Sequence, residues 1–291
     1  MRRTLTLVTV LGAMLAVLLG VSGPASAVQF GEPDNNRHPW VGLVVFYEDG
    51  VVLWRCTGSL IDPTTFLTAG HCTGEDPDSG QEPDSAQIWF DEGPIIPGNY
   101  PSGSGLPCTG YTGYPCTGGD ATGTPIEHPD WTGYLSLPNT NDVGVVILDE
   151  PVIMEEYGQL APVGYLDDLA TRRGLQDITF TVVGYGVQSV RPRASAVRQR
   201  LLATVNLVNL RSALTDGYNL HYSSNPGLGH GGPGGTCFGD SGGPVIYNDP
   251  VLGEIIVGVN SFVLNANCKG AGFAYRVDTA DVQEFIEDAS S

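Results

Sequence analysis

Positive charge is scarce in this sequence. Its 291 residues include 13 Lys and Arg against 32 Asp and Glu, for a net charge of -19. So acidic a chain does not attract nucleic acid or an anionic membrane through its overall field. The imbalance excludes charge-driven binding of polyanions and favours solubility outside the cell.

Long apolar runs are missing, apart from one at the N-terminus. Two arginines precede an apolar stretch from about Leu5 to Val21, and SGPASA then ends in a small-x-small pattern at Ala27. This order is typical of a secretory signal peptide. An uncleaved membrane anchor is the alternative, but Pro24 and the Ala-x-Ala ending favour cleavage. We therefore expect residues 1–27 to be a signal peptide and the protein to be secreted, with no membrane contact afterwards.

The sequence contains no C-x-x-C pair and no histidine cluster, which argues against a bound metal. Six cysteines in an exported chain indicate disulfides instead, although the residue pattern leaves their connectivity open. They are Cys56, Cys72, Cys108, Cys116, Cys237 and Cys268. The acidic segment Glu75–Asp84 matches no defined calcium pattern, so we expect a solvated loop there. We expect neither a metal nor a cofactor.

Helical periodicity is nearly absent. Short runs rich in Val, Ile, Phe and Tyr alternate with turn residues, and the chain holds 40 Gly and 21 Pro. This spacing predicts an all-β sandwich or barrel. The expected strands are Val41–Phe46, Trp54–Ile61, Phe66–Thr68, Gln87–Phe90, Val143–Leu148, Ile178–Val183, Ala203–Val208, Pro244–Tyr247, Ile255–Val259 and Phe273–Val277.

Two further segments, Pro94–Asp130 and Asn225–Gly235, are dense in turn residues and are expected to be loops. Only the C-terminal sequence DTADVQEFIEDA predicts a helix. Its apolar residues Val282, Phe285 and Ile286 fall on one face, and Asp278 or Thr279 can cap its start.

No histidine follows Ser241, and this absence decides how its motif is interpreted. The sequence GDSGG satisfies G-x-S-x-G, the nucleophile elbow of lipases and esterases, in which the triad histidine comes after the serine. The lipase interpretation is therefore excluded. The other known order is present, with His71 in LTAGHC, Asp142 in NTNDVGVVILDEP and Ser241 in GDSGGP.

These three motifs, in this order, resemble those of the trypsin/chymotrypsin-like serine peptidases, and the resemblance covers Val28–Ile286. It implies an all-β fold of two antiparallel six-stranded barrels, to which the predicted C-terminal helix is added. The first barrel, with the histidine and aspartate, is expected in residues 28–155. The second, with the serine, is expected in residues 156–291, so that residues 28–291 form one peptidase domain.

The resemblance gives each motif residue a role in an acyl-enzyme mechanism. Ser241 is the nucleophile, His71 is the general base and then the acid, and Asp142 orients His71. The N–H groups of Gly239 and Ser241 form the oxyanion hole. Ser261, in GVNSF, resembles the family serine that hydrogen-bonds the triad aspartate.

Family positions also imply two disulfides. Cys56–Cys72 would hold the loop that carries His71, and Cys237–Cys268 would tie the nucleophile loop to the pocket wall. This leaves Cys108 and Cys116, whose short spacing indicates a local staple on an inserted loop.

The family is activated by a free apolar N-terminus that pairs with the aspartate before the nucleophile. Asp240 is present for that role, and Val28 directly follows the predicted cleavage site. We therefore expect signal peptidase itself to create the activating terminus. Phe30 departs from the glycine usual at its position.

Trypsin-like relatives carry an aspartate six residues before the nucleophile, where this chain has Gly235. A buried cation without a partner is costly, so we expect no cleavage after Lys or Arg. The pocket walls are expected around Ser261, Phe262, Val263 and Gly272. They favour a medium-sized apolar residue before the scissile bond.

The sequence thus predicts a secreted, monomeric, bacterial-looking serine endopeptidase that acts on proteins or peptides. The alternative from another class is a catalytically silent homologue that only binds. Such homologues usually lose a triad member, and none is missing here.

Overall fold

The computed structural model describes residues 28–29, 31–96, 115, 118–170, 177–188, 190, 196–224 and 234–291. Most regular structure in these ranges is antiparallel β-strand. The expectations for residues 1–27, Phe30, Cys108 and Cys116 lie outside the described residues.

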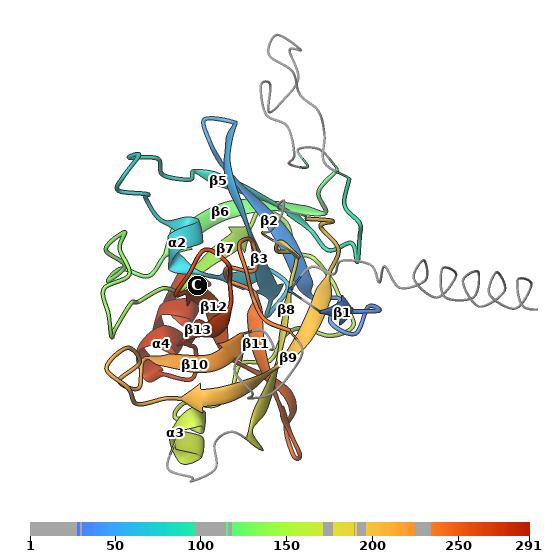
Figure 1. Cartoon of the computed structure of the whole chain (residues 1–291). Helices are drawn as coiled ribbons and strands as arrows, with labels where there is room; N and C mark the ends of the chain where they lie inside the picture. Colours follow the sequence, from blue (N-terminus) through green and yellow to red (C-terminus); the bar gives the residue numbers. More distant parts are fainter. Residues whose placement is uncertain are drawn as a thin grey trace, which may run out of the picture.

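Six strands close the first barrel in the order β2-β3-β4-β7-β6-β5. It occupies the upper part of Figure 1. Its strands are β2 (Val41–Glu48), β3 (Val51–Leu60), β4 (Thr65–Thr68), β5 (Ser85–Trp89), β6 (Ala121–Glu127) and β7 (Gly144–Leu148). All neighbouring pairs are antiparallel.

The second barrel has the order β9-β10-β13-β12-β11-β8, and β8 pairs with β9 to close it. Its strands are β8 (Thr179–Gly184), β9 (Leu201–Asn209), β10 (Asn219–Ser224), β11 (Pro244–Asp249), β12 (Gly253–Val263) and β13 (Gly270–Arg276). The short strand β1 (Glu32–Pro33) adds to β9 from outside. The expected fold of two six-stranded antiparallel barrels is confirmed.

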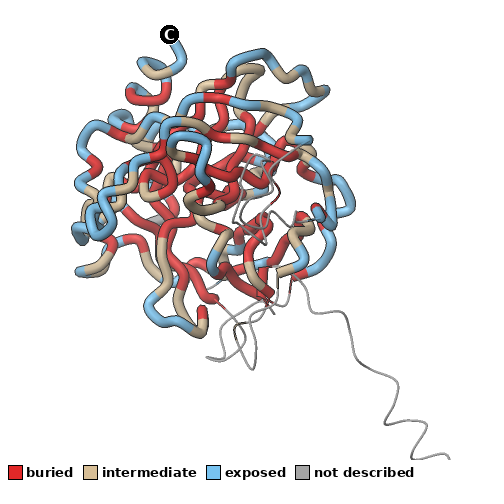
Figure 2. The backbone as a smooth tube through the Cα atoms, turned by 90° about the horizontal axis from the view of Figure 1, so that it is seen from above, coloured by how far each residue is buried: buried red, intermediate tan, exposed pale blue. Residues whose placement is uncertain are grey.

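Each barrel is filled by the inward side chains of its strands. Phe66 and Ile88 are fully buried in the first barrel, and Val205 and Leu220 are fully buried in the second. Figure 2 shows buried residues mainly in the interior of the molecule and exposed residues mainly at its periphery. Burying one such side chain contributes about 1.5–3 kcal/mol, so these interiors hold the strands that carry the site.

The C-terminal helix α4 (Ala280–Ala289) is confirmed, and the side chain of Thr279 caps it by accepting a hydrogen bond from the N–H of Val282. Its apolar residues Val282, Phe285 and Ile286 join the core cluster that contains the first-barrel interior. The helix follows the second barrel in the chain but packs against the first, and so it fastens the two together. No helix in the described ranges has the length and apolar character needed to cross a bilayer.

The structure contains elements that the sequence did not predict. They are β1, β6, β10 and two short helices, α2 (Gly70–Thr73) and α3 (Tyr165–Ala170). The strand β6 lies inside Pro94–Asp130, which was wrongly expected to be loop throughout. Its sequence ATGTPIE has few strand-forming residues, and its ladder depends on pairing with β5 and β7 on its two sides.

A buried ion pair connects the barrels. The Nε atom of Arg200 lies 3.0 Å from Oδ2 of Asp34, and both side chains are fully buried. The same guanidinium donates to the backbone carbonyls of Val41, at 3.0 Å, and Phe90, at 2.9 Å. Arg200 precedes β9 of the second barrel, whereas these two carbonyls belong to the first. Removing one partner of such a pair leaves the other charge buried and uncompensated.

We predict that Arg200→Met lowers the free energy of unfolding by about 3–5 kcal/mol, because the buried Asp34 then loses its guanidinium partner and keeps only the hydrogen bonds of His38. Urea unfolding at neutral pH measures the change. The exposed Arg211 offers a matched control, and Arg211→Met should change stability by less than about 0.5 kcal/mol. A loss at position 200 no larger than that of the control would contradict this view of the ion pair.

Candidate active site

His71 is placed by a single helical turn. The helix α2 directly follows β4, and the disulfide Cys56–Cys72 binds this turn to β3. The His71 ring atom Nδ1 lies 2.9 Å from Oδ2 and 3.0 Å from Oδ1 of Asp142. A carboxylate only accepts hydrogen bonds, so Nδ1–H is the donor. This leaves Nε2 as the free basic nitrogen of the ring.

Asp142 is a fully buried carboxylate whose partners come from both barrels. It accepts hydrogen bonds from the backbone N–H of His71, at 2.8 Å, from the His71 ring, and from the hydroxyl of Ser261 on β12. Burial alone would raise the pKa of Asp142, but the charge of His71 and these hydrogen bonds lower it. Asp142 is therefore held ionised.

The same pair raises the pKa of His71. Burial opposes the charged form of the ring, but the charge of Asp142 and its hydrogen bond outweigh that effect. The side chain of His71 is 31% exposed, whereas that of Asp142 is fully buried. The imidazole therefore has one face open to a ligand while its partner is shielded from water.

Ser241 lies on a tight loop that β3 holds in place. The N–H of Thr57 donates to the carbonyl of Ser241, and the Thr57 hydroxyl donates to the carbonyl of Gly239, each at 2.8 Å. Gly242 has a φ of 76°, and a Cβ there would lie 2.0 Å from Oγ1 of Thr68. Only glycine fits this position, which explains part of the glycine density of GDSGG.

Two N–H groups of the GDSGG loop have no hydrogen-bond acceptor among the described residues, which leaves them free to bind a ligand. The N–H groups of Asp240, Gly242 and Gly243 donate to carbonyls of Cys237, Asn260 and Asp240. Those of Gly239 and Ser241 donate to no acceptor in the part of the chain that the structure describes. Gly239 has a φ of 93°. This pair of free donors is what an oxyanion hole requires.

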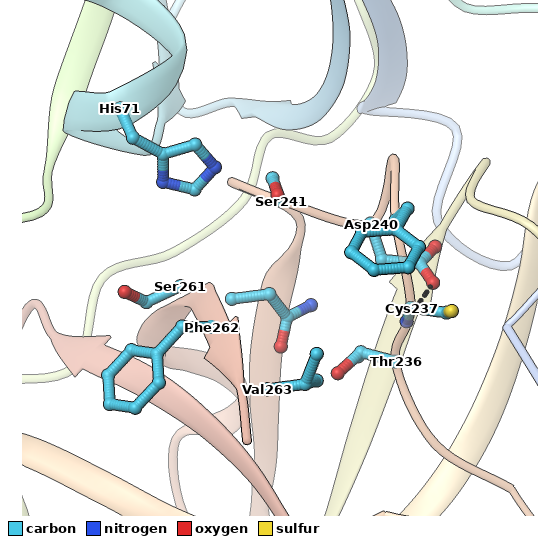
Figure 3. A pocket seen from close by; sticks show the side chains of 10 residues that line it. His71, Thr236, Cys237, Asp240, Ser241, Ser261, Phe262 and Val263 are labelled. Carbon is cyan, nitrogen blue, oxygen red and sulfur yellow. Dashed lines mark hydrogen bonds between the residues drawn. The ribbon is translucent and has the colours of Figure 1, made fainter. Parts of the chain in front are cut away.

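A pocket of about 240 Å³ brings these groups together. His71 and Ser241 both line it, and the labelled side chains of Figure 3 surround the same space. The lining also includes Thr236, Cys237, Phe238, Asp240, Asn260, Ser261, Phe262 and Val263. His71 comes from the first barrel and the other lining residues from the second, so the pocket lies between the barrels.

Two expected pocket residues are not among its lining. The N–H of Gly235 donates to the carbonyl of Gln29, at 3.0 Å. Gly272 lies under the ring of Tyr222, where a Cβ would approach the ring to 2.3 Å. Thr236 and Asn260 line the pocket but were not predicted from the sequence, although they directly neighbour the predicted residues Gly235 and Ser261. Neither residue carries a motif, so adjacency was their only signal.

The loop around the nucleophile is anchored by a disulfide and a buried acid. Cys237 is bonded to Cys268, and the N–H of Cys237 donates to Asp240 at 2.9 Å, the dashed line in Figure 3. Asp240 also accepts from the N–H of Gly186, at 2.8 Å. Burial raises the pKa of Asp240 to about 7, against the effect of these bonds. The charge of Arg55 also lowers this pKa, but Asp240 forms no ion pair with a Lys, Arg or His within the described ranges.

One group of possible metal ligands lies at this centre within the described residues. Cys56, His71 and Cys72 lie close enough together to bind an ion, but the two cysteines are bonded to each other. A disulfide sulfur is not the thiolate that a metal binds.

Two antiparallel six-stranded barrels, with a pocket lined by Ser241 and by the Asp142-bound His71, have the architecture of the chymotrypsin-like serine peptidases. The family model described as Trypsin matches residues 28–286, and the chain belongs to the trypsin family. Brachyurin from Leptuca pugilator is 27% identical over 226 residues, which cover 76% of this chain and 80% of that protein. Members of this protease family act on peptides or proteins, which are therefore the implied substrates.

We predict that Asp142→Asn lowers the pKa of His71 from above its ordinary value of 6.5 to below it. The substitution removes the negative charge and leaves the desolvation that favours neutral imidazole. An NMR titration of the ring nitrogens measures the pKa. Asp130→Asn, at an exposed aspartate nearby, is the control and should leave it unchanged. An unchanged pKa in the Asp142 variant would show that the pair does not govern His71.

Proposed function

We propose that this chain is a secreted serine endopeptidase that hydrolyses peptide bonds through His71, Asp142 and Ser241. One observation carries the proposal: an Asp142-bound imidazole and the Ser241 hydroxyl line one pocket, beside two unused N–H groups. Membership of the trypsin family supports it. We further propose that residues 1–27 are removed as a signal peptide and that residues 28–291 act as one monomeric domain, without nucleic-acid or membrane partners.

The chemistry follows from these positions. Ser241 Oγ attacks the peptide carbonyl while Nε2 of His71 takes its proton. The oxyanion that forms accepts hydrogen bonds from the N–H groups of Gly239 and Ser241. His71 then gives its proton to the leaving amine, which departs and leaves an ester on Ser241. Water, deprotonated by His71, hydrolyses the ester, and Asp142 stabilises the imidazolium in both halves.

The pocket supports a specificity unlike that of trypsin. Asp240 is the one carboxylate among its described lining residues, and its two oxygens accept hydrogen bonds from the N–H groups of Gly186 and Cys237. Gly235 contributes no side chain. A substrate Lys or Arg would therefore be desolvated without a dedicated partner, which is unfavourable.

We predict that an organophosphonate labels Ser241 and stops peptide hydrolysis. Ser241→Ala should not be labelled and should lose about 10⁴-fold or more of kcat, because the covalent step is removed. Mass spectrometry of the labelled peptide and a casein assay measure both effects. Ser223→Ala, at a serine on β10 outside the pocket, is the control. A native protein that is neither labelled nor active would favour the alternative, a homologue that binds without catalysis.

We also propose that cleavage after Ala27 activates the enzyme. Val28 is fully buried, and its φ of 51° is a left-handed conformation that costs a residue with a Cβ about 1–2 kcal/mol. Cleavage removes the carbonyl that defines this torsion and so releases the strain. It also creates an ammonium next to Gln29, whose carbonyl binds Gly235 on the nucleophile loop. This cation would supply the missing partner of Asp240.

We predict that a chain with Ala27 retained before Val28 has a kcat/KM about 10- to 100-fold lower than a chain that begins at Val28, because a charged hydrogen bond is lost. Matched peptide assays on the two proteins measure this ratio.

The same two proteins give a stability test. With Ala27 retained, Asp240 forms no ion pair within the described residues and its pKa is about 7 in the folded state, whereas unfolded aspartate ionises near 3.8. The Tm of that chain should therefore fall as the pH rises from 3.8 to about 7 and level off above it. The chain that begins at Val28 should show no such fall. Equal activity and equal pH profiles would contradict the activation proposal, as would a secreted N-terminus several residues from Val28.

A further inference from the structure

Three buried polar side chains, which we call the polar base, are joined by hydrogen bonds at the pocket; Thr236 and Asn260 line the pocket, and Tyr222 does not. The hydroxyl of Tyr222, on β10, donates to Oδ1 of Asn260, on β12, at 2.8 Å. The Tyr222 oxygen also lies 2.8 Å from Oγ1 of Thr236. Tyr222 has one proton and gives it to Asn260, so Thr236 must be the donor to Tyr222. Because Thr236 donates its only hydroxyl proton to Tyr222, the lone pairs of Thr236 Oγ1 remain available to accept a hydrogen bond.

At the other end of this series of hydrogen bonds, the Asn260 amide has an unpaired donor. Nδ2 of Asn260 is buried and has no hydrogen-bond partner within the described ranges, and the residue as a whole is 2% exposed. Asn260 lines the same pocket as Ser241 and His71. Native structures rarely leave a buried amide unpaired, so each case calls for an explanation. A substrate side chain in the pocket would give this N–H₂ group its acceptor.

Glycine at position 272 makes this arrangement possible. The ring of Tyr222 lies over Gly272 on the neighbouring strand β13, to which β10 is paired. A Cβ at Gly272 would lie 2.3 Å from the ring and displace it. The small residue therefore allows a tyrosine from another strand to extend its hydroxyl to Asn260 and Thr236.

The charge of the pocket restricts the acceptor. Its described lining includes the Asp240 carboxylate and no Lys or Arg. A Glu or Asp side chain would enter beside Asp240 without a cation, which is costly. An apolar side chain would leave Nδ2 of Asn260 unpaired. A neutral primary amide avoids both penalties, because its oxygen accepts from Asn260 and its N–H₂ donates to Thr236.

We propose that this pocket selects glutamine or asparagine as the residue before the scissile bond, with Asn260 and Thr236 as the specificity-determining side chains. The inference rests on the proposed peptidase function and names its substrate class. It replaces the apolar preference expected from the sequence, which was inferred from the walls at Phe262 and Val263 without knowledge of the polar base.

The test is a set of peptides that differ only at this residue. Gln is compared with Met and Glu, and Asn with Leu and Asp, which are similar in size but differ in polarity or charge. We expect kcat/KM for Gln or Asn to exceed that of each comparison residue by about 10-fold or more, the effect of two hydrogen bonds. Organophosphonate titration of Ser241 gives the active fraction, so that unfolded protein does not affect the ratio.

Variants assign the preference to the proposed side chains. In Asn260→Leu the ratio of Gln to Met, or of Asn to Leu, should fall to about one, and in Thr236→Val it should fall part of the way. Asn248→Leu is the matched control, because Asn248 is an exposed asparagine on β11 away from the pocket, and its ratio should equal that of the native protein. If Asn260→Leu cannot be titrated because it does not fold, Thr236→Val alone decides whether the ratio depends on the polar base.

The outcomes separate this inference from the function on which it rests. Cleavage after Met or Leu as fast as after Gln or Asn would overturn the inference and leave the peptidase intact. If no peptide is cleaved, binding of the same fluorescent peptides to Ser241→Ala protein decides. Tighter binding of the Gln or Asn peptide there supports the pocket assignment and overturns the peptidase function, whereas equal binding overturns the pocket assignment.

Discussion

The carboxylate of Asp142 is the point on which the rest of the site depends. It is fully buried between the barrels, and its hydrogen bonds come from the backbone and ring of His71 in one barrel and from Ser261 in the other. A buried charge is tolerated only when such donors surround it. The two barrels must therefore meet in one relative position, and in that position His71 and Ser241 line the same pocket. The contacts that bury Asp142 therefore also set where His71 lies in this pocket.

Other buried polar groups follow the same rule between the barrels. Arg200 satisfies Asp34 and two carbonyls of the first barrel. Asp240 is different, because its partners are two N–H groups and its pKa is raised to about 7. Asn260 is different too, because its Nδ2 is unpaired in the described structure. The buried groups whose hydrogen bonds are complete hold the two barrels together. Asp240 and Asn260, whose hydrogen bonds are incomplete, line the pocket with Ser241. In our proposals a new N-terminus binds Asp240 and a substrate side chain binds Asn260.

Local pattern was enough to predict most strands and the last helix. Runs of Val, Ile and Phe predicted strands such as β2 and β7, because their own side chains drive burial. The strands β6 and β10 escaped prediction, since ATGTPIE and NLHYSS carry little intrinsic preference and gain their pairing from neighbours. Among the site residues, the motif order indicated His71, Asp142 and Ser241. It gave no indication of Thr236 or Asn260, which belong to no motif.

The order of the His, Asp and Ser motifs and the absence of a later histidine were sufficient to indicate a family, a two-barrel fold and a reaction class. These features depend on which residue types are present and in what order, and both can be seen directly in the sequence. The composition of the pocket was decided only by tertiary structure. Tyr222, Thr236 and Asn260 come from different parts of the chain and meet because β10, β13 and β12 are neighbours in the second barrel. Such contacts depend on which strands pair and on which residues face the same cavity. Neither can be predicted from the residue pattern of a single segment.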